Sequence, residues 1–430
     1  MRRFALHAGA LLLAGALASA PAAAEPAVPG PALLDEPALI GQALVLADER
    51  LALMPQVAAA KWPRQLPVSD PAREQAVVAD AAARAAALGL DAQAVAAYFQ
   101  LQFGFARAVQ QRLIDAWTAH APAAAAPPPD LAGELRPHLD RLTAGTLRAL
   151  YLVAPFAQGA GFRERALVEA ASRLPAARWS EPDRAALVEA LARVRATAPA
   201  SVARVRAAAV LRIGTPADYA PFSVARDGRL EGSDVELMLS FAHSLGVEAV
   251  FVRSSWRSLT DDLRAGRFDL AVGGVSVTAA RAALATFSAP IARSGKTAIG
   301  RCTDAARFGR LADIDAAGVT VVFNPGGTNE SFARSHLHAA RLAEHTDNRT
   351  IFDELDARRA DVMFTDETEV ALAVHHHPGL CRLLPEAYEA TDKAFLLPKE
   401  SDLASAVEPW LTGELKRGTP ALLLERYLSR

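Results

Sequence analysis

The stretch TVVFNPGGTNESF, residues 320–332, decides how the second half of the chain folds. Three β-branched residues and Phe323 predict a short strand, Pro-Gly-Gly predicts a turn, and Thr328 opens an expected helix. A strand that leads through glycines into a helix N-terminus is typical of α/β folds and can hold an anion on its free amides. A passive turn would have the same sequence, so the flanking segments must decide between the two interpretations.

Two halves of different character surround this stretch. From Ala209 onward, β-branched runs such as LRIGTP, AVFVRSSW, DLAVGGVS and ADVMFTDE alternate with amphipathic segments, which predicts an α/β fold. From about Pro37 to Ala198 the chain is rich in Ala, Leu and Arg with apolar residues three and four apart, which predicts helices alone. We therefore expect an all-α domain at 25–198, a linker at 199–206 and an α/β domain at 207–430.

Composition limits the classes of function. The 430 residues suffice for two or three domains, and a hydrophobic content of 51% excludes general disorder. A formal net charge of -2 gives no electrostatic reason to expect nucleic acid or an anionic membrane as a partner. Ligands must therefore be argued from local features.

The first 24 residues have the composition of an export signal. A basic start, the apolar run ALLLAGALASA and the small residues of APAAAEP predict cleavage near Ala24 and a periplasmic protein. A membrane anchor is the alternative. In an oxidising compartment the two cysteines, Cys302 and Cys381, could form one disulfide, or remain two buried thiols.

Polar residues in the helical half are placed where they could converge. Arg50 and Lys61 are about three helical turns apart, which predicts that both project from one face of a first long helix. The sequence SDPAREQ predicts a second helix capped by Ser69 or Asp70, with Arg73 one turn further on.

A later segment, YFQLQFGFARAVQQR, places Gln102, Ala106 and Gln110 on one stripe of a helix. A glutamine on such an apolar face should have a partner inside the domain. Taken singly, these residues also fit solvated helix faces and a satisfied core amide.

As a set, three segments resemble the secreted, all-helical chorismate mutases from about Leu39 to Ala196: ADERLALMPQVAAAKWPRQLPVSDPAREQ, FQLQFGFARAVQQR and DLAGELRPHLDRL. That family has a Pro-rich loop inside the domain at the position of residues 121–130, so we expect an inter-helix loop there although its composition suits a linker. The resemblance implies a possible homo-oligomer. It also implies the active-site positions Arg50, Lys61, Asp70, Arg73, Gln110 and Arg136.

The reaction of that family explains the residue types. Chorismate rearranges to prephenate by an intramolecular pericyclic shift, which requires no nucleophile, metal or cofactor. Arginines suit the two carboxylates, and Lys61 and Gln110 would donate to the ether oxygen. Ala106 departs from the family, since relatives commonly carry a small polar residue there.

The C-terminal half looks like a two-lobed periplasmic solute-binding protein, with IGTPADYAPFS first, GSDVELMLSFAHSLG next and a second lobe at about 301–387. In that superfamily the ligand lies between the lobes. GGVSVTAARAALATFS would supply Ser276, Thr278 and the carboxylate-binding Arg281, and NPGGTNE, which contains Thr328, would be the anion loop of the second lobe. A plain amino-acid receptor would share nearly all of this.

Several stretches are closer to one enzymatic branch. ADYAPFS, SSWRSL, SGKTAI, ARFGRL, NPGGTNESFA, DNRTIF, VMFTDETEV and KAFLLP resemble the periplasmic cyclohexadienyl dehydratases from about Val205 to the C-terminus. The resemblance implies the site residues Asp218, Trp256, Ser276, Arg281, Lys296, Asn324 and Glu369.

Within that set, each residue has an expected role. Glu369 would be the general acid, with a pKa raised by enclosure beside Trp256. Arg281 and Lys296 would hold carboxylate charge, and Asn324 would orient the substrate. The alternative for Glu369 is a solvated acid at a helix start.

Asp366 and the run of three histidines bear on which ligands the α/β half could bind. Asp366 lies where amino-acid receptors keep an acid for the ligand's ammonium, which leaves room for arogenate as well as prephenate. His375–His377 lack acidic or cysteine partners at ligand spacing, so no metal site is predicted.

Together the halves predict a bifunctional enzyme that converts chorismate to prephenate and then to phenylpyruvate, and arogenate to L-phenylalanine, without a cofactor. The alternative is a chorismate mutase fused to a solute-binding or sensor domain that catalyses nothing.

Overall fold

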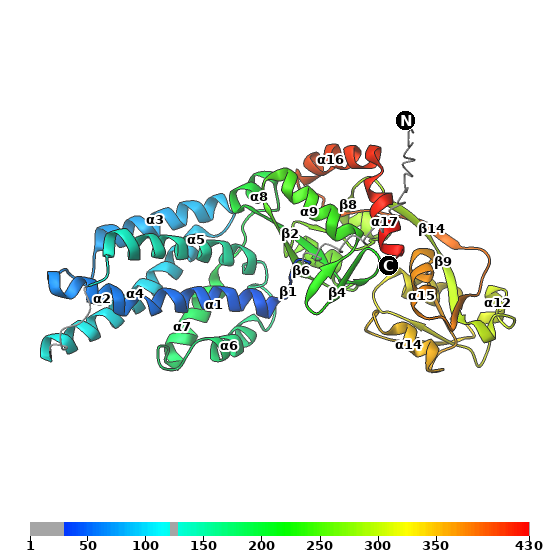
Figure 1. Ribbon diagram of the computed structural model, residues 1–430, viewed down its shortest axis with the longest axis horizontal. Helices are drawn as coiled ribbons and strands as arrows, with labels where there is room; N and C mark the ends of the chain where they lie inside the picture. The colour runs from blue at the N-terminus through cyan, green and yellow to red at the C-terminus, as the bar shows by residue number, and fades with distance from the viewer. Residues whose placement is uncertain (1–29, 121–127, 430) are drawn as a thin grey trace, which may run out of the picture.

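The computed structural model describes residues 30–120 and 128–429, and places the helical half and the α/β half at opposite ends of an elongated molecule (Figure 1). The expected signal peptide and most of the Pro-rich stretch at 121–130 lie outside the described residues. Within them, no helix is both long enough and apolar enough to cross a membrane.

The helical half is a bundle whose apolar faces meet in one core. Its helices are α1 (Glu36–Ala52), α2 (Met54–Lys61), α3 (Pro71–Ala87), α4 (Ala92–Ala119), α5 (Arg136–Val153), α6 (Phe162–Arg173) and α7 (Glu181–Arg193), with a 3-10 turn at Trp62–Arg64 and a π-helical turn at Leu131–Leu135. Asp70 caps α3 by accepting a 3.2 Å hydrogen bond from the Arg73 amide, which confirms one of the two predicted caps.

One predicted helix is interrupted. Arg50 and Lys61 do not share a single long helix, because α1 ends at Ala52 and α2 starts at Met54. Pro55 has no amide proton and therefore occupies the first turn of a new helix. The two side chains still reach the same hollow, as described below.

The α/β half has two lobes, each built on a sheet. The first sheet has the order β1-β6-β2-β7-β15-β8, and the second has β11-β10-β12-β9-β13 with β14 paired to β9. The first lobe contains β2 (Val210–Thr215), β3 (Asp218–Tyr219), β4 (Ser223–Arg226), β5 (Arg229–Glu231), α9 (Ser233–Leu245), β6 (Glu248–Arg253), α10 (Leu259–Arg264), β7 (Leu270–Ala271), α11 (Ala279–Leu284), β8 (Ala285–Phe287), β15 (Leu396–Pro398), α16 (Leu403–Arg417) and α17 (Thr419–Leu428).

The second lobe extends beyond the expected 301–387. It contains β9 (Ala292–Arg301), a 3-10 turn (Cys302–Asp304), α12 (Leu311–Ile314), β10 (Thr320–Phe323), α13 (Thr328–His336), β11 (Arg341–Glu344), α14 (Ile351–Asp356), β12 (Val362–Asp366), α15 (Glu367–His376), β13 (Leu380–Arg382) and β14 (Tyr388–Lys393). Cys302 and Cys381 form a disulfide in this lobe, so they are not two free thiols.

One strand from the start of the chain joins the sheet of the α/β half, where we did not expect it. β1 (Leu33–Leu34) pairs in parallel with β6, with Leu33 opposite Phe251, although residues 25–198 were expected to form the helical domain alone. A two-residue strand has too little sequence pattern to be predicted, and it needs the exposed edge of β6 to form.

The halves are also joined by packing. Residues 199–206, the expected linker, include most of α8 (Val202–Ala208), where Arg204 is buried and its Nε donates to the Leu88 carbonyl at 3.0 Å. Arg212 and Asp269 form a buried ion pair, with 2.6 Å between Arg212 Nη2 and Asp269 Oδ1. The Arg212 guanidinium also lies 4.5 Å from the ring centroid of Tyr151 in α5. The connection is therefore a packed interface.

Candidate active sites

The helical half contains a hollow whose walls come from α1, α2, α3, α4 and α5. All six positions implied by the resemblance line it: Arg50, Lys61, Asp70, Arg73, Gln110 and Arg136. In Figure 1, α2 lies at the end of the molecule away from the α/β half. This first site is therefore remote from the lobes.

Arg50 has several partners inside this hollow. Its side chain is buried, its Nη1 donates to Thr143 Oγ1 at 3.1 Å, and its guanidinium lies 5.0 Å from the ring centroid of Phe103. Burial, with the nearby charge of Arg73, lowers the pKa of Arg50 to about 10, so it remains a cation at neutral pH.

The two expected donors to the ether oxygen come from different helices. Lys61 Nζ donates to the Val68 carbonyl at 2.6 Å, and burial lowers its pKa, partly offset by Glu74 and Asp70. Gln110 Nε2 donates to the Ala106 carbonyl at 3.2 Å, while its Oε1 accepts no hydrogen bond within the described residues.

Neighbouring residues in the hollow were not predicted. Arg107 pairs with Glu74, and Arg73 Nη2 lies 3.6 Å from Asp140. Arg107 is three residues before Gln110 on α4, and this spacing could have identified it. Gln102 is buried, but within the described residues neither its Oε1 nor its Nε2 has a hydrogen-bond partner, so the internal partner expected for a glutamine on this face is not found for Gln102.

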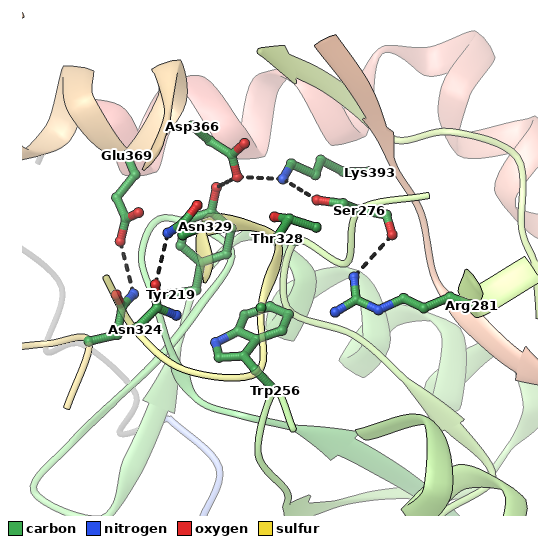
Figure 2. A pocket seen from close by; sticks show the side chains of 13 residues that line it. Tyr219, Trp256, Ser276, Arg281, Asn324, Thr328, Asn329, Asp366, Glu369 and Lys393 are labelled. Atoms are coloured by element: carbon green, nitrogen blue, oxygen red, sulfur yellow. Dashed lines mark hydrogen bonds and ion pairs between the residues drawn. The ribbon is translucent and has the colours of Figure 1, made fainter. Parts of the chain in front are cut away.

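The second site is a cleft between the two lobes (Figure 2). Of the residues expected there, seven line it: Trp256, Ser276, Arg281, Asn324, Thr328, Asp366 and Glu369. Tyr219, Asn329, Asn348 and Lys393 also line it and were not predicted. Lys393 opens the quoted segment KAFLLP, which was the available signal for it.

Three expected site residues lie behind this lining. Asp218 accepts a 2.8 Å hydrogen bond from Trp256 Nε1. Thr278 caps α11 by accepting from the Arg281 amide at 3.3 Å, and Lys296 pairs with Asp366 at 3.0 Å. Burial raises the pKa of Asp218 to about 6, partly offset by the Trp256 hydrogen bond. All three therefore hold lining residues in position.

Asp366 is surrounded by donors. Its Oδ2 accepts hydrogen bonds of 2.5 Å from both Tyr219 Oη and Lys393 Nζ, and Lys296 Nζ lies 3.0 Å from Oδ1. Burial alone would raise the pKa of Asp366, but Lys296 and Lys393 outweigh it and hold that pKa well below its ordinary value. Asp366 is thus ionised and paired.

Glu369 lies near the start of α15 and is buried, which excludes a solvated acid. Asn348 Nδ2 donates to its Oε1 at 3.0 Å, and the Thr365 hydroxyl bonds its Oε2. Burial, with the charge of Asp366, raises the pKa of Glu369 to about 7, partly offset by Thr365, Lys296 and Asn348. At neutral pH it can therefore donate a proton.

Arg281, in α11, lines the cleft on the side of the first lobe. Its Nη1 donates to the Ser276 carbonyl at 3.1 Å and its guanidinium lies 5.8 Å from the Trp256 ring centroid (Figure 2). Burial lowers its pKa from the ordinary value. A guanidinium that faces a cleft in this way can bind a carboxylate.

The loop quoted first is more than a passive turn. Gly327 and Thr328 line the cleft, but the Gly326 amide donates to Glu330 Oε2 at 2.6 Å and is not free for an anion. Gly326 has φ +82, and an added Cβ would lie 2.5 Å from the Arg257 amide nitrogen of the first lobe. The glycine therefore allows the lobes to approach each other.

The histidine run has acidic neighbours that spacing in the sequence did not reveal. His377 Nδ1 lies 2.6 Å from Asp356 Oδ2, and Asp353 completes a group whose ligand atoms lie within 4.8 Å of one another. Both aspartates are exposed. Such surface groups are common without a metal.

Comparison with known proteins divides the chain in the same way. Residues 211–430 match the bacterial extracellular solute-binding proteins, family 3, and residues 41–111 match chorismate mutase type II. The chain therefore belongs to family 3 of the bacterial extracellular solute-binding proteins and carries a chorismate mutase domain in its helical half.

Two individual proteins are similar to the α/β half of this chain. The cyclohexadienyl dehydratase of Pseudomonas aeruginosa is 42% identical over 251 residues, which cover 56% of this chain and 94% of that protein. The L-cystine-binding protein TcyJ of Escherichia coli K12 is 26% identical over 226 residues, covering 52% of this chain and 84% of that protein.

Among solved structures, the ancestral amino acid-binding protein AncCDT-1, described as a precursor of cyclohexadienyl dehydratase, has a TM-score of 0.50 and 28% identity. The match covers 53% of this chain and 99% of that one.

Proposed function

We propose that the chain is a bifunctional enzyme of phenylalanine biosynthesis. Its helical half is a chorismate mutase, and its α/β half is a cyclohexadienyl dehydratase that converts prephenate to phenylpyruvate, and arogenate to L-phenylalanine. The observation that carries the second assignment is the buried, protonatable Glu369 in the cleft.

In the first reaction the ether C–O bond of chorismate breaks while a C–C bond forms, so no atoms are gained or lost. Arg50, Arg73 and Arg136 would hold the carboxylates of the folded substrate. Lys61 and Gln110 would donate to the ether oxygen, which gains negative charge in the transition state. A fixed donor of this kind is worth roughly 3 to 4 kcal/mol of barrier.

In the second reaction the ring carboxylate of prephenate leaves as CO2 and the ring hydroxyl leaves as water. Glu369 would give its proton to that hydroxyl, since hydroxide is a poor leaving group. The electron pair of the broken C–C bond completes the aromatic ring, and Glu369 then regains a proton from solvent. Arg281 would hold the side-chain carboxylate, and Asn324 would orient the ring.

A receptor would use the same lobes but has no need for a buried acid at the position of Glu369. Removing a carboxyl group from water is costly, and its retention beside the ionised Asp366 raises its pKa further. This favours catalysis over capture. The 42% identity to a dehydratase supports the same choice.

Two further parts of the proposal come from the sequence. The composition of residues 1–24 supports export to the periplasm after their removal, and the resemblance to the helical mutases supports a homo-oligomer. Because the two sites lie in different halves, prephenate would leave the first site and diffuse to the second.

One assay tests the proposal. Purified protein is given chorismate without added cofactor, and chorismate, prephenate and phenylpyruvate are followed by liquid chromatography. Phenylpyruvate should form. A mutase fused to a receptor would instead stop at prephenate. No loss of chorismate would reject the mutase, and prephenate supplied directly then tests the dehydratase.

A further inference from the structure

Glu369 lines two cavities. One is the cleft, and the other is a hollow, here called the rear recess, that is lined by Asp218 and β4 of the first lobe and by Asn348 and α15 of the second lobe. Asn348 also lines both cavities. The side chains of Glu369 and Asn348 therefore form the wall between them.

The rear recess is open to solvent and is the larger of the two cavities. Arg226, Arg349 and His376 line it and are exposed. Its volume is about 380 Å³, whereas that of the cleft is about 20 Å³. Because one water molecule needs roughly 10 to 15 Å³, the recess can hold many waters while the lobes are together, and the cleft can hold about one.

Each dehydration consumes one proton. Prephenate enters as a dianion, and the monoanion of phenylpyruvate leaves with neutral CO2 and water. The proton that Glu369 gives to the ring hydroxyl must therefore be replaced from solvent. Figure 2 shows Glu369 at the end of the cleft away from Arg281, and a molecule held by Arg281 would fill the space between them.

The proton donors of the cleft are held by Asp366. Its Oδ2 accepts from Tyr219 Oη and from Lys393 Nζ, both at 2.5 Å, and Lys296 Nζ lies 3.0 Å from its Oδ1. A proton given up by one of these groups would leave the buried Asp366 charge with one partner fewer, which is costly. They are therefore poor sources of a proton for Glu369.

The hydrogen bonds that Glu369 accepts come from groups that are not acids. Asn348 Nδ2 donates to its Oε1 at 3.0 Å, and the Thr365 hydroxyl bonds its Oε2. Neither an amide nor an alkyl hydroxyl gives up a proton near neutral pH. Asn348 Oδ1 is buried and accepts no hydrogen bond in the part of the chain that the structure describes, so it can hold a water of the rear recess beside the carboxylate.

The rear recess also contains groups that exchange protons. Its ionisable residues besides Glu369 are Asp218, Arg226, Arg349, His376 and His377. Burial raises the pKa of Asp218 to about 6, and burial lowers the pKa of His376 from its ordinary value. Both groups can therefore take up and release protons at neutral to mildly acidic pH.

We propose that the rear recess is the proton supply of Glu369, and that water in the recess returns a proton to the carboxylate while the product is still in the cleft. The inference rests on the proposed dehydratase activity. It gives a cavity outside the cleft a part in each turnover.

Two substitutions fill the recess from opposite lobes: Leu372→Trp in α15 and Val224→Phe in β4. Leu422→Trp, at a leucine of α17 that is 64% exposed, is the matched control. Each protein, in excess, is mixed rapidly with prephenate at about pH 6, where Glu369 starts protonated. Phenylpyruvate is measured after quenching, and proton uptake is followed with a pH indicator before the released CO2 hydrates.

The unaltered protein and the control should take up the proton as fast as phenylpyruvate forms. Both filled variants should form the first phenylpyruvate at a normal rate, because Glu369 already carries its proton. Their proton uptake should be delayed by about tenfold or more, and with excess prephenate the later turnovers should slow by the same factor.

The remaining outcomes are decisive as well. Proton uptake that lags behind phenylpyruvate in the unaltered protein would show that Glu369 waits for the lobes to open, and this overturns the inference even where the filled variants do not fold. Undelayed uptake in a folded filled variant also overturns it, as does a first turnover slowed as much as the uptake. An unaltered protein that forms no phenylpyruvate from prephenate rejects the dehydratase activity itself.

Discussion

Asn348 Nδ2 donates a 3.0 Å hydrogen bond to Glu369 Oε1, and Asn348 is itself held by the Asp218 carbonyl of the other lobe at 3.1 Å. The acid is therefore oriented by a residue that bridges the two lobes. This geometry keeps Glu369 in the cleft while the lobes are together.

Glu369→Gln should lower dehydration of prephenate by about a thousandfold or more, because the amide cannot give up a proton to the leaving hydroxyl. Chorismate loss should be unchanged, so prephenate accumulates and is measured by chromatography. Glu367→Gln, two residues earlier and only partly buried, is the matched control and should behave as the unaltered protein. Normal phenylpyruvate formation by Glu369→Gln would remove Glu369 from the reaction.

Glu369→Gln should also have a larger free energy of unfolding than the unaltered protein at high pH. Glu369 loses its proton near its ordinary pKa in the unfolded chain and near pH 7 in the folded one, so the folded state holds the extra proton in between. Its stabilising contribution is complete below about pH 4.5 and is lost as pH rises through 7. Glutamine does not titrate.

The stability gain of Glu369→Gln should therefore grow from pH 5 to pH 7.5 and reach about 2–3 kcal/mol. Thermal unfolding at several pH values measures it. A gain that is the same at pH 5 and pH 8 would contradict a raised pKa.

Lys61→Ala should slow chorismate rearrangement by roughly a hundredfold to a thousandfold, because one donor to the ether oxygen is lost. Added prephenate should be consumed at the normal rate. Lys416→Ala, at an exposed lysine of α16, serves as the control. Loss of both activities in folded Lys61→Ala protein would show that the two halves do not act separately.

Gln110→Glu should move the mutase optimum toward acid. An amide donates at any pH, so the unaltered mutase rate should be nearly flat through neutrality, whereas a carboxyl group donates only when protonated. Initial rates of chorismate loss between pH 5 and pH 9 measure this. An unchanged profile would place Gln110 outside the site.

Cys302→Ser with Cys381→Ser should destabilise the second lobe by about 2–4 kcal/mol, since the disulfide closes a loop whose ends are 79 residues apart. Denaturant unfolding measures the loss, and reduction of the unaltered protein should reproduce it. Chorismate turnover should persist. Identical unfolding with and without reductant would contradict a stabilising bond.

Local sequence patterns predicted much of this fold. The cap of α3 and the strand-loop-helix around Gly326 were predictable because capping and turns depend on neighbouring residues. The break before Pro55 was missed because the spacing of Arg50 and Lys61 fits a continuous helix equally well.

The candidate sites were less predictable where they depend on distant partners. Asp366 was identified by its motif, but its pairing with Tyr219 and Lys393 joins residues 147 and 27 positions away. Asn348 lies in the quoted segment DNRTIF, but its contacts with Asp218 and Glu369 across two lobes could not be read from that segment. Sequence indicates which groups are present, whereas tertiary structure decides which of them are already paired.

β1, which precedes the bundle in the chain, adds two residues to the sheet of the first lobe. α8, which follows the bundle in the chain, leads into the same lobe. The bundle is thus inserted between two attachments to the same lobe. Proteolysis in residues 199–201 would leave the fragments bound to each other, and a gene whose coding region began after Leu34 would encode a lobe with an uncovered β6 edge.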